Sequence, residues 1–544
     1  MRSIRGISLI TVVAMAAFAL LSPIGPSVAA QNRDDADFDS LRPGLIANYR
    51  SLVDAGAAFD RIEAKPAFSL GRSNPHARIP PGPFEAVWTG TLYVKDPGPI
   101  RFDGFVCGEV TAEIDGITVL DGRGDTETVK LDCRQELIRD VGLYPVRIRY
   151  RSRAERPARL QLWWRGPTFS REPLPAWHLY HKAAEVPETL GREQLAERGR
   201  VAVERFGCAR CHAGAFPGVA APPPGPSLAD AGRRIDRGWL LDWLAGPANL
   251  RSDARMPALF ADDRAGFVER WLVAEYLVGH ETKPQPENTG DHRVGRRTFI
   301  NLGCAACHSM PDASRDEHPE LDRTPLTGLT ERLPAAELAA FLGNPHARYP
   351  DGRMPRVPLT PEAARDIAAF LLLWSKPAPR DREAVAPTQE EMTRVARRLG
   401  VRGAKAAGEA LVREKRCAAC HPGVGHETVA ETLITATDDR NGCLSGKTLP
   451  RFTLDRPTHD SIKAYRGVAA KDKYPSAFVS RQRLVAHLGC VRCHQRDSDR
   501  PSPLEIAGST LGSSMLMVIP YQRAPRLTDP HQKYTRSALL AAVR

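Results

Sequence analysis

The sequence predicts a multidomain protein in which an N-terminal antiparallel β-sandwich is followed by tandem all-α domains. Residues 31–185 contain short segments rich in Val, Ile, Tyr and Trp, which alternate with period two and are separated by Gly, Pro and Asp. This pattern is typical of antiparallel strands. From residue 190 onwards, one cysteine motif recurs four times, in most copies behind a helix-like stretch. Such repetition indicates units of one type.

Length and composition limit the class of protein. The chain has 544 residues, of which 42% are hydrophobic, so it can form several cores and is too apolar for a disordered protein. Its 76 Lys and Arg residues against 64 Asp and Glu give a formal net charge of +12. The Arg residues alternate with acids and form no basic stripe, so we expect no nucleic-acid partner.

The N-terminus has the features of an export signal. Two arginines precede an apolar segment from Ile7 to Leu21, and small residues follow up to Ala30. The apolar segment has about 15 residues, fewer than the roughly 20 that span a bilayer. We therefore expect residues 1–30 to be a cleaved signal peptide. The mature chain would be exported, periplasmic or extracellular, with no transmembrane segment.

Eight of the 11 cysteines belong to four copies of the pattern Cys-x-x-Cys-His. The three side chains share one face of a helical turn, so both thiols can form thioethers to one haem while the imidazole ligates its iron. Zinc ribbons and thioredoxin-like pairs also use Cys-x-x-Cys, but four copies that each end in His indicate covalent haem attachment, about four haem c groups in all. The expected residues are Cys208, Cys211 and His212; Cys304, Cys307 and His308; Cys417, Cys420 and His421; and Cys490, Cys493 and His494.

Two Met-Pro pairs lie at similar distances behind the first two motifs. Met256 follows His212 by 44 residues, and Met354 follows His308 by 46. A thioether is a suitable iron ligand opposite imidazole, so Met256 and Met354 are the expected sixth ligands of the first two haems, with core packing as the alternative. Downstream, Thr360, followed by Pro, is expected to begin another helix.

This order of helix, motif, proline loop, Met-Pro loop and helix resembles class I c-type cytochrome domains, over residues 190–284 and 288–378. In that family a loop proline carbonyl orients the proximal His. The resemblance implies this role for Pro226, Pro325 and Pro525 in the first, second and fourth copies. A glycine also precedes the first Cys by nine residues in three copies: Gly199, Gly295 and Gly408.

The third and fourth copies depart from the pattern. Residues 388–480 are expected to form an atypical third domain, and residues 481–544 an incomplete fourth one. Neither contains a Met-Pro pair behind its motif, so the sequence assigns no sixth iron ligand to the third or the fourth haem. An open haem would permit peroxide chemistry. The candidate ligands are His426, His459 and His487 for the third haem, and Met515, Met517 and His531 for the fourth.

The segment before the haem motifs resembles the protective-antigen-type β-sandwich, a domain often linked to glycan binding. The resemblance rests on several short stretches: Gly44-Leu45, Trp88-Thr-Gly90, Ile114-Asp115-Gly116, residues 142–150, residues 160–163 and the exit at 174–180. Members that bind sugar through calcium carry two adjacent aspartates ahead of the Asp-Gly turn. Here those positions are Cys107 and Gly108, so calcium is not expected as a cofactor. Cys107 and Cys133 are expected to form a disulfide. The leftover Cys443 is expected to be a packed thiol.

These observations favour an exported multihaem cytochrome c that carries electrons between periplasmic redox proteins, or to or from a dehydrogenase. The β-sandwich would be a docking or glycan-contacting module. Two alternatives stay open. One is a haem enzyme, either a peroxidase or the cytochrome subunit of a dehydrogenase, and the other is a carbohydrate-binding protein with polysaccharide as its partner.

Overall fold

The structure is a computed structural model of the whole chain. It describes residues 40–492 with gaps at 213, 217–218, 220–223, 230, 252–253, 279–288, 313–322, 327, 350–351, 376–384, 425–441 and 448. The expected signal peptide therefore lies outside the described residues, as do Cys493, His494 and the later candidate ligands. No helix in the described ranges is both long enough and apolar enough to cross a membrane.

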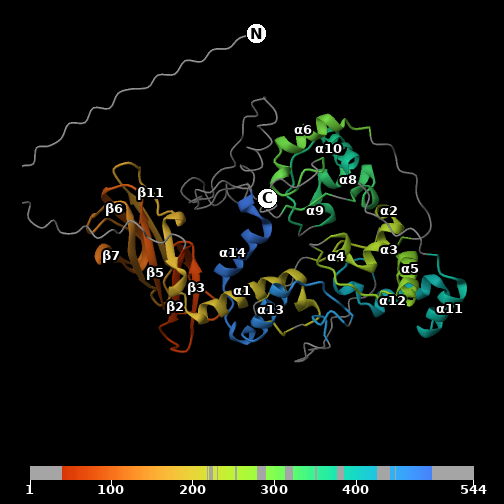
Figure 1. The fold of residues 1–544 in the computed structure, drawn as a ribbon, viewed down its shortest axis with the longest axis horizontal. Coiled ribbons are helices and arrows are strands. Elements are labelled where there is room, and N and C mark those ends of the chain that lie inside the picture. The colour runs from red at the N-terminus through yellow and green to blue at the C-terminus, as the bar shows by residue number, and fades with distance from the viewer. Residues whose placement is uncertain are drawn as a thin grey trace, which may run out of the picture. The chain divides into compact units, whose positions relative to one another are not determined.

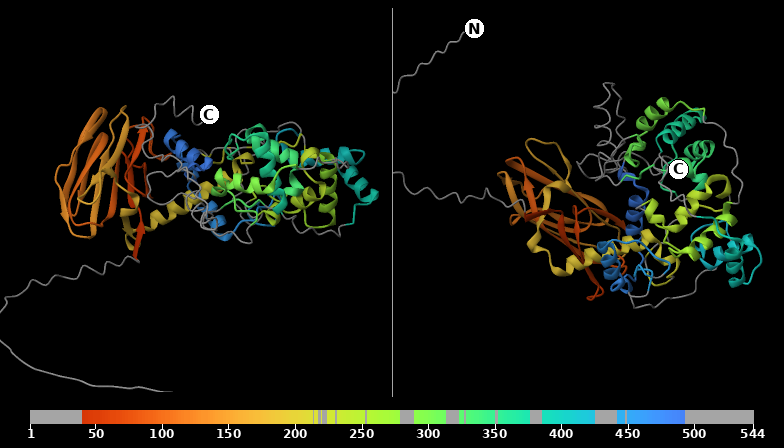
Figure 2. Two further views of the ribbon diagram at one scale, coloured as in Figure 1. Left: turned by 90° about the horizontal axis from the view of Figure 1, so that it is seen from above. Right: turned by 45° about the vertical axis from the view of Figure 1, so that its right-hand side comes forward.

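Twelve strands within the described residues form one continuous antiparallel sheet (Figure 1). The central order is β1-β12-β5-β9-β6-β10-β11, with β2, β3, β4, β7 and β8 attached to this path. The sequence predicts a sandwich of two sheets, whereas the structure has a single curled sheet around one core (Figure 2). The strands are β1 (Leu41–Pro43), β2 (Leu45–Ser51), β3 (Ala58–Glu63), β4 (Phe68–Gly71), β5 (Phe84–Val94), β6 (Gly98–Ile114), β7 (Ile117–Leu131), β8 (Leu137–Arg139), β9 (Gly142–Arg151), β10 (Ala158–Arg165), β11 (Glu172–Pro173) and β12 (Leu179–Lys182).

The core of the sheet consists of large aromatic side chains from alternate strand positions. Trp88 and Tyr150 are fully buried, and Phe68 packs edge-on against Tyr150 with ring centroids 4.9 Å apart. Strands β6 and β7 are joined by the predicted Asp115-Gly116 turn. Both turn residues have positive φ, 49° and 76°, as a two-residue hairpin of the primed type requires.

The expected disulfide between Cys107 and Cys133 is absent, and both residues are free thiols. Strand β7 ends at Leu131, and the chain then turns back, since the backbone N–H of Arg134 donates to the Val119 carbonyl at 3.0 Å. The part of β7 around Val119 pairs with β6 at Ala112 and Glu113 and not at Cys107. A disulfide needs Cα atoms within about 7 Å. The Cys133 thiol instead donates to the carbonyl of Gln135 at 3.1 Å.

Helices follow the sheet from residue 188 onwards (Figure 1). The predicted start at Thr360 is confirmed, because its side chain accepts a hydrogen bond from the Ala363 backbone N–H at 3.2 Å. The helices are α1 (Glu188–Phe206), α2 (Ala231–Arg234), α3 (Arg237–Ala245), α4 (Pro247–Leu250), α5 (Arg264–Val278), α6 (His292–Asn301), α7 (Leu329–Arg332), α8 (Ala335–Gly343), α9 (Pro345–Arg348), α10 (Pro361–Trp374), α11 (Gln389–Arg398), α12 (Ala404–Glu414), α13 (Arg456–Arg466) and α14 (Ala477–Leu488).

The prediction of tandem all-α cytochrome c domains is wrong. Among the three copies that the structure describes beyond their motif, the second alone pairs its own first and last helices, α6 and α10. The first and third copies exchange helix partners (Figure 1). Helix α1 of the first copy packs against α13 of the third, and α12 of the third packs against α5 of the first. The two copies are therefore interleaved in one helical unit. The described chain is a mixed β and α protein and not a sandwich followed by independent helical domains.

The repeated glycines mark the points where these helices cross. A Cβ atom at Gly199 would lie 1.8 Å from the carbonyl oxygen of Ser461 on α13, and a Cβ at Gly408 would lie 2.2 Å from that of Leu272 on α5. At Gly295 the corresponding distance, to Asp366 on α10, is 1.9 Å. Only glycine permits the two helix backbones to lie this close, so the repeated glycine indicates a helix–helix contact.

Candidate haem-attachment site

Each Cys-x-x-Cys-His motif begins with a short 3₁₀ turn that directly follows a helix. The turns are η4 (Cys208–Arg210), η5 (Cys304–Ala306), η7 (Cys417–Ala419) and η9 (Cys490–Arg492), which follow α1, α6, α12 and α14. In the three motifs described up to their histidine, the His backbone N–H donates to the carbonyl of the first Cys at 2.9–3.0 Å. The first Cys and the His thus occupy one turn in the same way in each motif.

The residue before the first Cys has a left-handed backbone in all four motifs. Gly207, Gly303 and Gly489 have φ values of 67°, 74° and 68°, and Arg416 has 54°. The left-handed residue ends the helix and turns the chain into the motif. Sequence reasoning missed this position, although a glycine precedes three of the four motifs. Arg416 is the exception, and a side chain there costs about 1 kcal/mol relative to glycine.

Two of the motif histidines are oriented by a backbone carbonyl. The ring Nδ1 of His421 lies 2.9 Å from the carbonyl oxygen of Pro226, and that of His308 lies 3.3 Å from the carbonyl oxygen of Thr324. A carbonyl only accepts hydrogen bonds, so Nδ1 carries the proton and Nε2 keeps its lone pair. Burial lowers the pKa of both histidines, which favours the neutral form that ligates metals.

These bonds correct the assignment of the loop prolines. Pro226 was expected to orient His212 of its own copy, but it orients His421 of the third copy. In the second copy the acceptor is Thr324 and not the adjacent Pro325. Pro525 lies outside the described residues.

The loop that holds His421 is built from the first copy and fits the third motif closely. The backbone N–H of Gly225 donates to the Cys420 carbonyl at 2.7 Å, and that of Leu228 donates to the Pro422 carbonyl at 2.9 Å. A Cβ atom at Gly225 would lie 2.6 Å from the His421 ring. The glycine therefore lets the loop backbone lie against the imidazole.

Met256 packs in the apolar cluster of the third motif and not in that of the first. Its side chain packs in the apolar cluster of α3, α5 and α12, which also contains Cys417 and Leu228. The indole N–H of Trp243 donates to the Met256 sulfur at 3.2 Å. Just behind Met256, Ala258 exchanges two backbone hydrogen bonds with Arg451, at 2.8 and 2.9 Å, downstream of the third motif.

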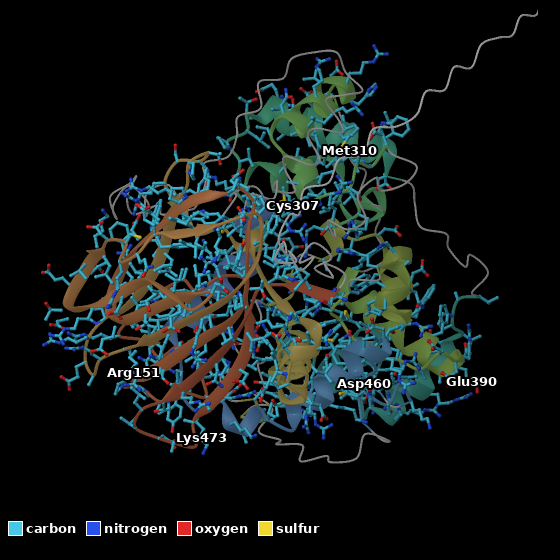
Figure 3. The ribbon with its side chains drawn as sticks, turned by 60° about the vertical axis from the view of Figure 1, so that its left-hand side comes forward. Arg151, Cys307, Met310, Glu390, Asp460 and Lys473 are labelled. Carbon is cyan, nitrogen blue, oxygen red and sulfur yellow. The ribbon has the colours of Figure 1, made fainter. Side chains whose placement is uncertain are left out.

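Met354 packs near the second motif, and its role as an iron ligand stays a prediction. It lies against the cluster of α6, α8 and α10 that also contains Cys304. Met310, two residues beyond His308, is buried in the same cluster and is labelled with Cys307 in Figure 3. Sequence reasoning did not single out Met310, although Pro311 follows it, because it lies only two residues beyond His308 and not at the spacing of the other two Met-Pro pairs.

The first motif lies in a separate cluster between α1 and α13. Cys208 packs there with Val203, Ile462 and Phe216. Burial raises the pKa of Cys208 to about 12, and the neighbouring Cys443 thiol adds to the rise. The leftover cysteine of the sequence thus lies near the first motif and is half-buried, as expected for a packed thiol.

The histidines proposed as ligands of the third haem gain no such role from the structure. His459 lies on α13, the helix packed against α1, with its Nδ1 3.6 Å from an Asp460 carboxylate oxygen. His426 lies outside the described residues, as does the side chain of His487.

The donor set of the third motif fits a covalently held haem. Two thiols and an imidazole share one turn, Nδ1 of that imidazole is held by Pro226, and Met256 and Leu228 supply an apolar surround. Haem iron ligation requires a neutral, oriented imidazole, and a thioether is a suitable ligand on the other side. The Cys417 thiol favours its protonated form, because burial raises its pKa to about 11.

No protein-family model matches this chain, and no curated protein matches it. Solved structures resemble about a quarter of it. An anti-sigma factor domain-containing protein is 21% identical, with a TM-score of 0.25, over 27% of this chain and 51% of its own. A relative from Clostridium clariflavum is matched over 49% of its own length, so this chain spans about half of either protein.

Two further similar structures are matched over nearly their full length. The PA14 domain of the antifreeze protein MpAFP is 16% identical over 29% of this chain and 100% of its own, with a TM-score of 0.23. The epithelial adhesin 9 A domain of Candida glabrata, in complex with Galb1-4GlcNAc, is 14% identical over 26% and 91%, with a TM-score of 0.21. At such TM-scores these likenesses carry no inference about activity.

The classification as a metal-binding cytochrome c is corrected at this point. Among the described residues, no group of three or more His, Cys, Asp and Glu could hold a metal ion. What stays a prediction is the covalent attachment of a cofactor at the individual motifs.

Proposed function

We propose that this chain is an exported protein that attaches haem covalently at its Cys-x-x-Cys-His motifs and passes single electrons to other redox proteins. The observation that carries the proposal is the hydrogen bond between His421 Nδ1 and the Pro226 carbonyl. It leaves Nε2 with a lone pair on the side of the motif where iron would bind. A spacing pattern alone does not require such a bond.

The chain's own residues would hold the cofactor in three ways. The cysteines of each motif would form the thioethers, and the histidine would ligate iron through Nε2. At the third motif Met256 would occupy the opposite side, and at the second motif Met354 would do so. Bound haem supplies reversible one-electron oxidation and reduction of iron, whose potential rises with Met/His ligation. The surrounding apolar clusters would exclude water from the iron.

The mass of the mature protein tests the proposal. We expect the intact protein, secreted from a host with haem c assembly machinery, to exceed its polypeptide mass by four haem groups. The double variant C417S/C420S should carry one haem fewer, because no thiol remains to attach it. A matched variant, C107S/C133S, should keep the full number. Native protein without covalent haem would contradict the proposal.

The outer face of the β sheet supports a second candidate function, contact with carbohydrate. Phe105 and Trp163 lie on the face of the sheet opposite the core cluster, since their strand neighbours at even positions face that core. Phe105 is half-buried, and Trp163 is buried with only 9% of its surface exposed. Their rings lie edge to face, 6.4 Å apart. The Arg171 guanidinium lies 4.1 Å above Trp163 and bonds the Asp103 carboxylate. Sites that recognise small ligands combine aromatic rings with a few polar or charged side chains.

Binding of the full-length protein to immobilised glycans would test this candidate. We expect the variant Trp163→Ala to weaken binding about tenfold or more, which corresponds to the loss of roughly 1.4 kcal/mol or more. Trp177→Ala, which alters a tryptophan elsewhere in the same domain, is the control and should bind as before. If wild-type protein binds no glycan, or if both variants bind equally well, the sheet face is not a sugar site.

A further inference from the structure

The first and third motifs are in direct contact. Arg210 lies between the two cysteines of the first motif, and its Nη1 donates to the carbonyl oxygen of Ala419 at 2.9 Å. Ala419 is the corresponding residue of the third motif and immediately precedes Cys420. The bond therefore connects the two cysteine-bearing turns, which are 209 residues apart in the sequence.

The contact is part of a larger interface between the first and third copies. The segment from Gly225 to Leu228, just beyond the first motif, makes the bonds to Cys420, His421 and Pro422 described above. The exchange of helix partners, α1 with α13 and α12 with α5, holds the same two copies together. Arg210 is thus kept in place by packing on both sides of it.

Arg210 also places a positive charge against the third motif. Its guanidinium donates to the carbonyl of Ala419, the residue directly before Cys420. One cationic side chain is thus shared by the two cysteine-bearing turns.

We propose that Arg210 joins the first and third motifs into one electron-exchanging pair, so that electrons pass between them without visiting the second motif. The inference rests on the proposed haem attachment. Haem bound at the two motifs would supply the exchange, in which one iron would be oxidised from ferrous to ferric as its partner was reduced, so no other reductant would be needed. Because a positive charge favours the less positive, ferrous state, Arg210 would raise the reduction potential of both members.

Spectroelectrochemical titration of the holoprotein tests the pairing. Arg210→Leu removes the shared charge, and we expect two of the four haem potentials to fall together. The exposed Arg198 lies on α1, the helix that precedes the first motif, and Arg198→Leu should leave all four potentials in place. The variants C208S/C211S and C417S/C420S identify the two haems, because each removes one of the two shifted components. A shift confined to the first haem, or no shift, would overturn the pairing.

Circular dichroism in the Soret region supplies a second measurement that does not depend on Arg210. The coupled signal of adjacent haems should lose the same component in C208S/C211S and in C417S/C420S, and the two losses should not add in the combined variant. C304S/C307S should retain that component. Additive losses, or loss of the component in C304S/C307S, would contradict the pairing. Haem content separates the hypotheses: no covalent haem defeats the proposed function, whereas four haems without these signals defeat the pairing alone.

Discussion

Replacing Gly199 with Ala is expected to destabilise the protein by about 3 kcal/mol, the upper end of the usual cost of overpacking. The added Cβ would lie 1.8 Å from the carbonyl oxygen of Ser461. The obstacle is backbone and not the end of a flexible side chain, so α1 and α13 must move apart along their whole contact. Thermal unfolding followed by circular dichroism would measure the effect as a lower midpoint.

The same helix supplies the control. Gly191 also lies in α1, but no atom lies within 4 Å of the place where its Cβ would be. Gly191→Ala should therefore be neutral or stabilise the protein by roughly 0.5–1 kcal/mol, since alanine loses less backbone entropy in a helix. Equal midpoints for the two variants would mean that the helices do not cross at Gly199.

The architecture within each copy could be predicted from local signals. Period-two alternation predicted strands where the structure has them, and the Asp115-Gly116 turn was expected from its residue types. Thr360 and the following Pro predicted the start of α10 because capping depends on adjacent residues alone. In each case the stabilising contact and the residues that form it lie within a few positions of one another.

The partners of the helices could not be predicted in the same way. Gly199 and Gly408 both mark a crossing, but a glycine shows only that some backbone comes close, not which one. Spacing suggested that the first copy folds on itself, so Met256 and Pro226 were assigned to His212. The structure gives both to the third motif. The repeated copies have similar apolar helix faces. Which faces pack together is decided by residues far apart in the sequence, and no short sequence pattern indicates it.

The disulfide shows the same limit in the β sheet. Cys107 and Cys133 were paired because they are the only two cysteines of their segment and the chain was expected to be exported. In the structure both are free thiols, because the chain beyond β7 turns back to Val119, which does not lie opposite Cys107. Register depends on the turns and bulges between β6 and β7, and counting cysteines cannot reveal it.

Replacing Met256 with Ala is expected to change the haem of the third motif and not that of the first. In C208S/C211S, which keeps the third haem, Met256→Ala should abolish the methionine–iron signature of that haem and lower its potential, within the ~0.8 V range that axial ligands cover. In C417S/C420S the same substitution should change no remaining haem. Met354→Ala is the control, because it should alter the second haem equally in both backgrounds. A change seen only in C417S/C420S would return Met256 to the first motif. The two backgrounds thus show which haem Met256 ligates. Sequence spacing suggests the first haem, whereas the apolar cluster that Met256 shares with Cys417 suggests the third.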